Sequence, residues 1–380
     1  MRWRRSFQLE RIVAIMKINK FLLQSDKCHI PALSEWFDPL FDDFRKGKRL
    51  EFLKLVAEGS LQYETVPCLC GSVFFDNLTT VDKHNIPQFT NLCVHCGLVV
   101  NMPRIDHAAY TWLYSSGMYR DLYSGGGERS VIYPADSGGV ADEMIANLAA
   151  WDCHLKSGSR VLEIGCNTGY NLHGLRRQGF NVAGIEPDGN ACAVGNAWGL
   201  NIQVGKIEDL KGNGDFDLVI MIECFEYMDL PYKALDNIRS FLKHGGFLYI
   251  QHIGLLRPMW QDIMRFPQIA HPYNYTLGTL AMVCRVAGFE LVHGDERIVA
   301  LFEYTGEFGS PIPDSRQYDL IADKFVGIEL RNNSAIYRTH QRFYTWLLQT
   351  QHQLRRRFSI IDTLAGWLLS AIPALKSRRP

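Results

Sequence analysis

The segment Val161–Tyr170 reads VLEIGCNTGY. Its first four residues are apolar except for Glu163, and two glycines, Gly165 and Gly169, follow them. The pattern predicts a strand that carries Glu163 near its end and leads into the turn Gly165–Gly169. Glycines permit a tight turn that a ligand can approach closely. The spacing E-x-G-x-x-x-G differs from that of dinucleotide binders, and it lacks the lysine of a phosphate loop. The run is therefore typical of an adenosine-type site, with an ordinary strand-to-helix turn as the alternative.

Further acidic residues end the next predicted strands. Glu186, in GIEPD, lies about twenty residues past the glycine turn, where a carboxylate can accept hydrogen bonds from both ribose hydroxyls. The segment Lys206–Asp209 follows a third strand, and a carboxylate with neighbouring backbone amides there can bind the edge of an adenine. The buried strand Phe216–Ile222 then leads into Glu223. This order is expected for one continuous ligand-binding edge.

The chain has 10 cysteines, and four of them form two pairs, Cys68/Cys70 and Cys93/Cys96. Each pair precedes a glycine, and two such knuckles can present four thiolates to a structural zinc ion. The first pair is CxC, which is tighter than the usual CxxC. His84 or His95 could therefore replace a cysteine, and four unligated core cysteines are the alternative. The other six cysteines are scattered along the chain, which is typical of free thiols in a reducing compartment.

Composition limits the classes of function. With 380 residues, 47% hydrophobic residues, 21% charged residues and a formal net charge of +0, the chain is predicted to be a globular protein with no bulk attraction for nucleic acid. No apolar run is long enough to span a bilayer. The basic and apolar N-terminus resembles a signal peptide, but it is interrupted at Lys17, Asn19 and Lys20, so we expect a cytoplasmic protein.

Predicted strands and helices alternate through the middle of the chain, which indicates a mostly parallel, doubly wound α/β sheet. A final hairpin adds one antiparallel strand near an edge of the sheet. The predicted strands are 160–164, 182–186, 202–205, 216–222, 247–252, 290–293 and 297–304. The predicted helices between them are 171–178, 190–198, 232–242 and 276–287, and a further helix, 139–153, precedes them.

The chain divides into four predicted segments. They are an N-terminal helical segment (1–65), a zinc-binding module with a Tyr-rich connector (66–134), the α/β domain (135–305) and a helical C-terminal region (306–380). Helix 33–58 carries a charge run that we expect to be a solvated face. The C-terminal region ends in an apolar stripe between basic clusters, which predicts peripheral contact with an anionic membrane, or packing on the domain or a second subunit.

Taken together, these motifs resemble those of the class I S-adenosylmethionine-dependent methyltransferases. VLEIGCNTG is similar to the first motif of that family, GIEPD to the acidic second, and FDLVIMIECFEYM with LKHGGFLYI to the later ones. The resemblance implies a Rossmann-like sheet over roughly 139–304. The zinc module, followed by CGLVVNMPR and YRDLYSGG, resembles a narrower group that includes methyltransferases of sugar, lipopolysaccharide and other glycan pathways. Some sugar C-methyltransferases of that group have a second full α/β domain at the C-terminus, where we expect only a helical tail, so that subgroup is disfavoured.

The resemblance implies which residues bind the cofactor. Glu163 and the turn of Gly165, Cys166, Asn167 and Gly169 would hold its methionine part. Glu186 and the adjoining Pro187 would hold the ribose. The family often has an aspartate where this chain has Lys206, so Ile207 and Glu208 are expected at the adenine. Glu223 would complete the edge, and Tyr119 or Tyr123 of the connector would close over the cofactor.

Methyl transfer also needs a group that removes the proton of the acceptor. Three candidates for this general base are His252 at the end of the fifth strand, His271 in HPYNYT, and Tyr227 just past the fourth strand. The two histidines rank ahead of the tyrosine because a histidine titrates near neutral pH. A structural hydrogen bond is the alternative role for each histidine.

The sequence favours O-methylation of a sugar, either nucleotide-linked or within a glycan such as a surface polysaccharide. The alternatives are C-methylation of a sugar, methylation of a non-sugar small molecule or a lipid-linked acceptor, and a non-catalytic relative that serves assembly. The intact cofactor residues count against the last alternative.

Overall fold

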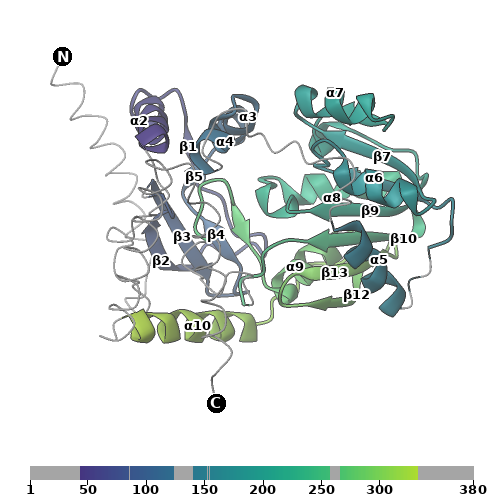
Figure 1. Cartoon of the computed structure of the whole chain (residues 1–380). Helices are drawn as coiled ribbons and strands as arrows, with labels where there is room; N and C mark the ends of the chain where they lie inside the picture. Colours follow the sequence, from purple (N-terminus) through teal and green to yellow (C-terminus); the bar gives the residue numbers. More distant parts are fainter. Residues whose placement is uncertain are drawn as a thin grey trace, which may run out of the picture.

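The computed structural model describes residues 43–84, 86–123, 140–151, 153, 155–256 and 266–332. Two sheets lie side by side within this part of the chain, one built mainly from the N-terminal third and one from the middle (Figure 1). The predictions for the N-terminus, for the glycines that end the connector and for the basic, apolar tail fall outside the described residues. No helix in the described part of the chain is long and apolar enough to cross a membrane.

The larger sheet has seven strands in the order β12-β13-β10-β9-β6-β7-β8. All neighbours pair in parallel except β13, which is antiparallel to both β10 and β12. This confirms the predicted mostly parallel sheet with one antiparallel strand near an edge. Its strands are β6 (Arg160–Ile164), β7 (Asn181–Glu186), β8 (Ile202–Val204), β9 (Phe216–Ile222), β10 (Leu242–Gln251), β12 (Phe289–Asp295) and β13 (Val299–Tyr304).

Helices cover both faces of this sheet, because alternate residues of its central strands are buried on opposite sides. Leu218 and Ile220 of β9 pack with Met144 of one helical layer, whereas Val219 and Met221 belong to the core on the other side. The helices are α5 (Ala141–Ala150), α6 (Tyr170–Arg177), α7 (Gly189–Ala197), α8 (Pro231–Phe241) and α9 (Leu277–Val286). The 3-10 turns η4 (Ile207–Asp209) and η5 (Phe225–Tyr227) follow β8 and β9.

The smaller sheet is four-stranded and antiparallel, in the order β11-β4-β3-β2. It consists of β2 (Phe75–Val81), β3 (Pro87–Cys93), β4 (Val99–Asn101) and β11 (Tyr273–Asn274), and the pair β1 (Tyr63–Glu64) and β5 (Arg104–Ile105) lies beside it. Strand β11 comes from the connection between β10 and α9. The predicted segments 66–134 and 135–305 therefore share one sheet, which the sequence did not indicate.

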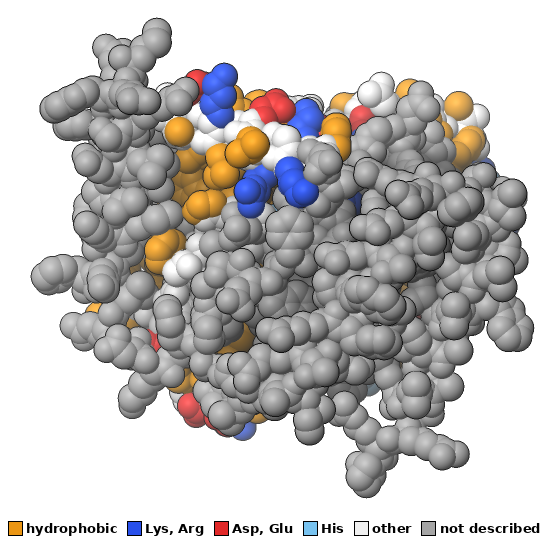
Figure 2. Space-filling view, turned by 60° about the vertical axis from the view of Figure 1, so that its left-hand side comes forward, with side chains coloured by type: hydrophobic (Ala, Val, Ile, Leu, Met, Phe, Trp, Pro, Cys, Tyr) orange, Lys and Arg blue, Asp and Glu red, His pale blue; other side chains and the backbone are white. Residues whose placement is uncertain are grey.

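Among the described residues, the helices of the N-terminal side are α2 (Asp43–Ala57), α3 (His107–Ser115) and α4 (Met118–Tyr123). Basic and hydrophobic side chains lie together on this face of the molecule (Figure 2). The prediction that the charge run of α2 is simply solvated was wrong. Lys48 pairs with Asp121 of α4 at 3.0 Å, and Arg49 donates to the carbonyl of His84 at 3.5 Å, so the basic residues of α2 join it to its neighbours.

Helix α10 (Arg316–Asn332) runs along the smaller sheet and continues toward the larger one (Figure 1). Ile321 and Phe325 are fully buried against Leu78, Leu92 and Val99 of strands β2, β3 and β4. At its N-terminal end, the carbonyl oxygen of the Gln317 side chain accepts a hydrogen bond from Thr276 at 2.7 Å. This helix therefore packs on both halves of the molecule.

We expect Phe325→Ala to lower the free energy of unfolding by about 3–5 kcal/mol, because it removes a fully buried ring. Leu320→Ala is the matched control on the same helix, since Leu320 is 50% exposed, and we expect a change within about 0.5 kcal/mol. Urea unfolding of the full chain measures both values. If Phe325→Ala changes the free energy of unfolding as little as Leu320→Ala does, then α10 does not contribute to the core.

Candidate functional site

The glycine turn after β6 lies at the carboxyl edge of the larger sheet. Gly165 and Gly169 have φ angles of +71° and +78°, in the left-handed region that favours glycine. A Cβ on Gly165 would lie 2.6 Å from the sulfur of Cys224, so no larger residue fits there without a shift. Cys166 is buried below the turn, where its sulfur occupies the space that a side chain on Gly184 would need. Asn167 also has a positive φ, of 51°.

Glu163 is almost completely buried behind this turn. Its Oε1 accepts a hydrogen bond from Asn171 at 2.8 Å, and its Oε2 has no hydrogen-bond partner among the residues that the structure describes. Burial raises the pKa of Glu163 to about 8. A buried carboxyl oxygen without a partner is costly, and the ammonium group of a bound amino acid would satisfy it. Glu163 therefore fits the role predicted for the methionine part of the cofactor.

Glu186 is held rigidly at the end of β7. Its Oε2 accepts a hydrogen bond from the amide of Asn167 at 2.9 Å, and its Oε1 accepts one from the amide of Asp188 at 3.0 Å. Burial still raises its pKa above the usual range. Each carboxylate oxygen retains capacity for another hydrogen bond, so Glu186 is suited to two adjacent hydroxyls. Pro187, between Glu186 and Asp188, turns the chain toward α7.

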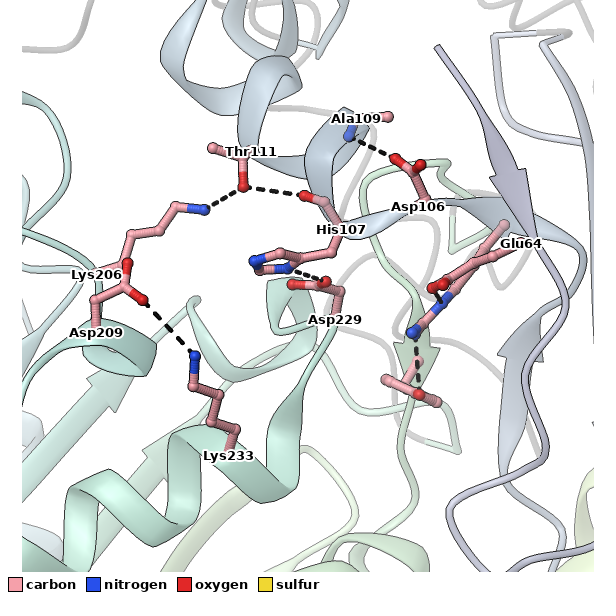
Figure 3. Close-up of polar contacts among 11 residues, drawn as sticks. Glu64, Asp106, His107, Ala109, Thr111, Lys206, Asp209, Asp229 and Lys233 are labelled. Atoms are coloured by element: carbon pink, nitrogen blue, oxygen red, sulfur yellow. Dashed lines mark hydrogen bonds and ion pairs between the residues drawn. The ribbon is translucent and has the colours of Figure 1, made fainter.

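The predicted adenine segment forms η4. Ile207 and Glu208 are both buried, and Asn237 of α8 donates to the carbonyl of Ile207 at 2.8 Å. Burial raises the pKa of Glu208. Lys206, at the position where relatives often have an aspartate, points away to α3 and donates from Nζ to the hydroxyl of Thr111 at 2.7 Å (Figure 3).

A pair of carboxyl groups follows β9, and sequence reasoning identified only one of them. Glu223, which has a positive φ of 49°, is accessible to solvent, whereas Glu226 is buried and its Oε2 has no partner. Burial, followed by the charge of Glu223, raises the pKa of Glu226, and the surrounding protein raises the pKa of Glu223 to about 7 by displacing part of its hydration, although its side chain is exposed. A carboxyl pair with raised pKa values can hold a proton near neutral pH. The run ECFEY contains both residues, but its letters alone do not show that they interact.

Aromatic side chains of α3 and α4 pack against residues of the segments that follow β9 and β10. The hydroxyl groups of Tyr119 and Tyr227 are 2.7 Å apart, and their rings meet edge to face at 5.4 Å. Tyr114 and His271 each pack edge to face on Tyr227, at 6.1 Å and 4.6 Å. Tyr123 stacks beside Tyr119 at 5.4 Å. We define Tyr114, Tyr119, Tyr123, Tyr227 and His271 as the aromatic wall.

Tyr123 joins this wall to the smaller sheet. Its hydroxyl donates to Asp82 at 2.7 Å and accepts a hydrogen bond from the amide of Ile269 at 3.2 Å. His84 packs on its ring at 4.9 Å, far along the hairpin from the cysteine pairs, so His84 is not part of the cysteine cluster. The hydroxyl of Tyr123 is thus engaged with Asp82, and that of Tyr119 with Tyr227.

The two candidate histidines are buried. Burial lowers the pKa of His252 to about 4 and that of His271 well below its ordinary value, so both rings are neutral at pH 7. His252 lies directly after β10, with Nδ1 3.2 Å from the carbonyl of Ile253, and the Nε2 atoms of both rings have no hydrogen-bond partner. A neutral imidazole has one ring nitrogen that can accept a hydrogen bond. Of the three candidates, His271 and Tyr227 are in contact.

The four cysteines converge on one point. Their sulfurs all lie within 4.8 Å of one another, with Cys68 and Cys96 3.6 Å apart and Cys70 and Cys93 3.7 Å apart. Four sulfurs bound to zinc at about 2.3 Å are about 3.8 Å apart in a tetrahedron, so the cluster fits a zinc ion. The amide of Leu98 approaches the sulfur of Cys96 at 3.5 Å, as expected in a zinc knuckle. The nearest nitrogen of His95 is 3.9 Å from the sulfur of Cys70.

Comparisons with known proteins agree with this geometry. Residues 138–294 match the family model described as "Methyltransferase domain". Residues 138–294 form a methyltransferase domain. A ubiquinone biosynthesis O-methyltransferase of Xylella fastidiosa is 31% identical over 105 residues, 26% of this chain and 43% of that protein. The C-methyltransferase NovU of Streptomyces niveus is 25% identical over 169 residues, 42% of this chain and 40% of NovU.

The chain thus spans less than half the length of these curated relatives. A solved structure, the 1,6-didemethyltoxoflavin-N1-methyltransferase of Burkholderia thailandensis with bound S-adenosylhomocysteine, is 18% identical and covers 54% of this chain and 93% of its own, with a TM-score of 0.40. The residues that match the family model, 138–294, include the glycine turn, Glu163, Glu186 and most of the carboxyl edge of the larger sheet.

We expect S-adenosylhomocysteine to displace a proton from Glu163 when it binds at pH 7. The buried carboxyl is protonated below its raised pKa of about 8, and a bound ammonium favours the ionised form. Calorimetry in buffers of different ionisation enthalpy should show release of about one proton, which disappears in Glu163→Gln. A variant that releases as many protons as the wild type would contradict this assignment.

The same pKa shift affects the ligand-free protein. The unfolded chain loses this proton at a lower pH than the folded protein, so the free energy of unfolding contributed by Glu163 falls as pH rises toward 8. Relative to wild type, Glu163→Gln should therefore become more stable between about pH 5 and pH 8. A constant difference over that range would show that the carboxyl is ionised at neutral pH.

We expect the purified protein to contain one equivalent of zinc, and Cys96→Ser to lose most of it together with thermal stability. Metal analysis and thermal unfolding measure the two effects. Cys153→Ser is the control, because Cys153 is a buried thiol outside the cluster. A zinc content below about half an equivalent in the wild type would rule out a tetrathiolate site.

Proposed function

We propose that this protein is an S-adenosylmethionine-dependent methyltransferase that transfers a methyl group to a hydroxyl of a sugar, either nucleotide-linked or within a glycan such as a surface polysaccharide. The observation that carries the donor assignment is the row of carboxylates Glu163, Glu186 and Glu208 along the edge of the methyltransferase domain. When bound, the cofactor supplies an electrophilic methyl group on a sulfonium. Glu163 would hold its amino group, and Glu186 its ribose.

The acceptor side has the chemistry expected for a neutral, polyhydroxylated molecule. Aromatic rings offer flat apolar faces for the C–H face of a sugar, and the paired hydroxyls of Tyr119 and Tyr227 offer hydrogen bonds. Glu223 adds an accessible carboxyl group at the same edge. This combination favours a sugar over a purely apolar acceptor, and it is the support for the glycan assignment.

Several groups could take the proton of the acceptor. His271 is neutral, buried and in contact with Tyr227, so it can accept a hydrogen bond from a hydroxyl that lies along the wall. His252 is neutral as well. The chain's own contribution to the reaction would be to align the hydroxyl, exclude water with the aromatic wall and accept this proton. We keep His252, His271 and Tyr227 as the proposed bases, with His271 first.

C-methylation of a sugar is the second candidate, favoured by the similarity to NovU over 42% of this chain. A non-sugar or lipid-linked acceptor is the third, and the similarity to ubiquinone biosynthesis O-methyltransferases supports a small-molecule hydroxyl. We further propose a structural zinc ion, a cytoplasmic location, peripheral membrane contact through the tail, and no nucleic-acid partner.

We expect the full chain to bind S-adenosylhomocysteine, and Glu186→Ala to weaken that binding at least tenfold, because two charge-assisted hydrogen bonds to the ribose are lost. Calorimetry measures the dissociation constants, and Asp236→Ala, a surface carboxylate outside the site, is the control. Equal affinity of wild type and Glu186→Ala would show that the ribose binds elsewhere.

The acceptor class is tested by incubation with methyl-labelled S-adenosylmethionine and a panel of nucleotide sugars, free glycans, phenols and lipid-linked sugars. The glycan assignment predicts label on a sugar, and NMR of the product distinguishes an O-methyl from a C-methyl group. Transfer to phenols but not to any sugar would contradict it.

A further inference from the structure

Helices α3 and α4 contact the loops that follow β7, β8, β9 and β10 of the methyltransferase domain. Arg120 of α4 pairs with Asp188, next to the loop that holds Glu186. His107 of α3 pairs with Asp229, which follows η5, with Nδ1 and Oδ2 2.6 Å apart. Together with the bond between Tyr119 and Tyr227, these contacts attach one short segment to the loops after both β7 and β9.

The contact with the adenine loop joins a lysine to a hydroxyl group. Lys206 donates from Nζ to the hydroxyl of Thr111 at 2.7 Å, and this hydroxyl donates onward to the carbonyl of His107 at 3.0 Å (Figure 3). The single O–H of Thr111 is thus donated to the carbonyl of His107, so its oxygen faces the ammonium of Lys206 as an acceptor. Lys206 directly precedes Ile207 and Glu208, so its backbone belongs to the predicted adenine site.

The far end of α3 belongs to the aromatic wall. Tyr114 lies one helical turn after Thr111, and its hydroxyl donates to the carbonyl of Ala270 at 2.8 Å, beside His271. One rigid helix therefore connects the loop at the adenine to the residues at the acceptor. Gly117, with a φ of +78°, separates α3 from α4, and a Cβ there would meet no neighbour, so the two helices are joined at a position with room to adjust.

We propose that Lys206 and Thr111 are positioning residues that couple occupation of the adenine loop to the placement of the aromatic wall. Binding of the adenosine part fixes the loop that carries Lys206. Lys206 fixes α3 through Thr111, and α3 carries Tyr114 against the segment of His271. Bound donor then organises the acceptor site and raises the affinity for the acceptor. By linkage, bound acceptor raises the affinity for the donor by the same factor. This inference rests on the proposed function, because it requires that the edge binds S-adenosylmethionine.

The experiment uses the full chain labelled with 3-fluorotyrosine, with S-adenosylhomocysteine as the probe. Calorimetry gives its dissociation constant, and the fluorine resonance of Tyr114, assigned by its loss in Tyr114→Phe, reports on the wall. Wild type should bind and show a shifted Tyr114 resonance. Thr111→Val and Lys206→Met should each weaken binding about five- to tenfold and abolish most of that shift. The double variant should bind S-adenosylhomocysteine as tightly as the single variant with the lower affinity, because both substitutions remove the same hydrogen bond.

Two further variants separate coupling from folding. Thr111→Ser keeps the hydroxyl and should restore both the affinity and the shift. Lys211→Met removes a lysine of the same domain that pairs at the surface with Asp236, and it should behave as wild type.

The outcomes distinguish this inference from the function on which it rests. If wild type does not bind S-adenosylhomocysteine, the proposed function fails and the coupling fails with it. If wild type binds, and Thr111→Val and Lys206→Met bind equally well with an unchanged Tyr114 shift, the coupling is wrong and the proposed function stands. Lower melting temperatures with unchanged affinity would likewise show a purely structural contact.

Discussion

The pairing of β4 with β11 is the interaction on which the arrangement of the site depends. Asn101 of β4 stabilises this pairing. Its backbone amide donates to the carbonyl of Pro272, and its side-chain amide donates to the carbonyls of Gln268 and His271 at 2.7 Å and 2.9 Å. These bonds hold the connection after β10 against the N-terminal module. The same connection carries His271, so the join between the sheets also builds the acceptor side of the site.

The cysteine cluster and helix α10 stabilise this join from two directions. The cluster closes the end of the β2–β3 hairpin, and the opposite end of that hairpin carries Asp82, which accepts the hydrogen bond of Tyr123. Helix α10 packs Ile321 and Phe325 onto the smaller sheet. A structural zinc ion would thus act at a distance from the chemistry, by fixing the hairpin whose tip supports the aromatic wall.

Burial of acidic groups is the energetic cost of this site. Glu163, Glu186, Glu208 and Glu226 are all at least nine-tenths buried, and burial raises the pKa of each. Such groups weaken a ligand-free fold and are typical of functional sites. A cationic donor offsets the cost, because it brings an ammonium group and a sulfonium to an edge rich in carboxyl groups. The acidity of the edge also disfavours a strongly anionic group directly beside it.

The sequence predicted the larger sheet well because its signals are local. The central strands β6, β7, β9 and β10 are rich in apolar residues, and the glycine turn and GIEPD lie where strands end. Strand β11 has only two residues, and its partner β4 is far away in the sequence, so no local pattern could reveal it. The partners of Lys206, Asp229 and Glu226 were missed for the same reason: a charge in a sequence does not show which distant residue it will meet.

A crystal structure of the full chain with S-adenosylhomocysteine tests the central claim most directly. We predict that the ribose hydroxyls bind Glu186, that the amino group binds Glu163, and that the sulfur lies on the side of the edge nearer Tyr119 and His271. A ligand bound with its sulfur turned away from the aromatic wall, or bound outside the carboxyl edge of the seven-stranded sheet, would contradict it.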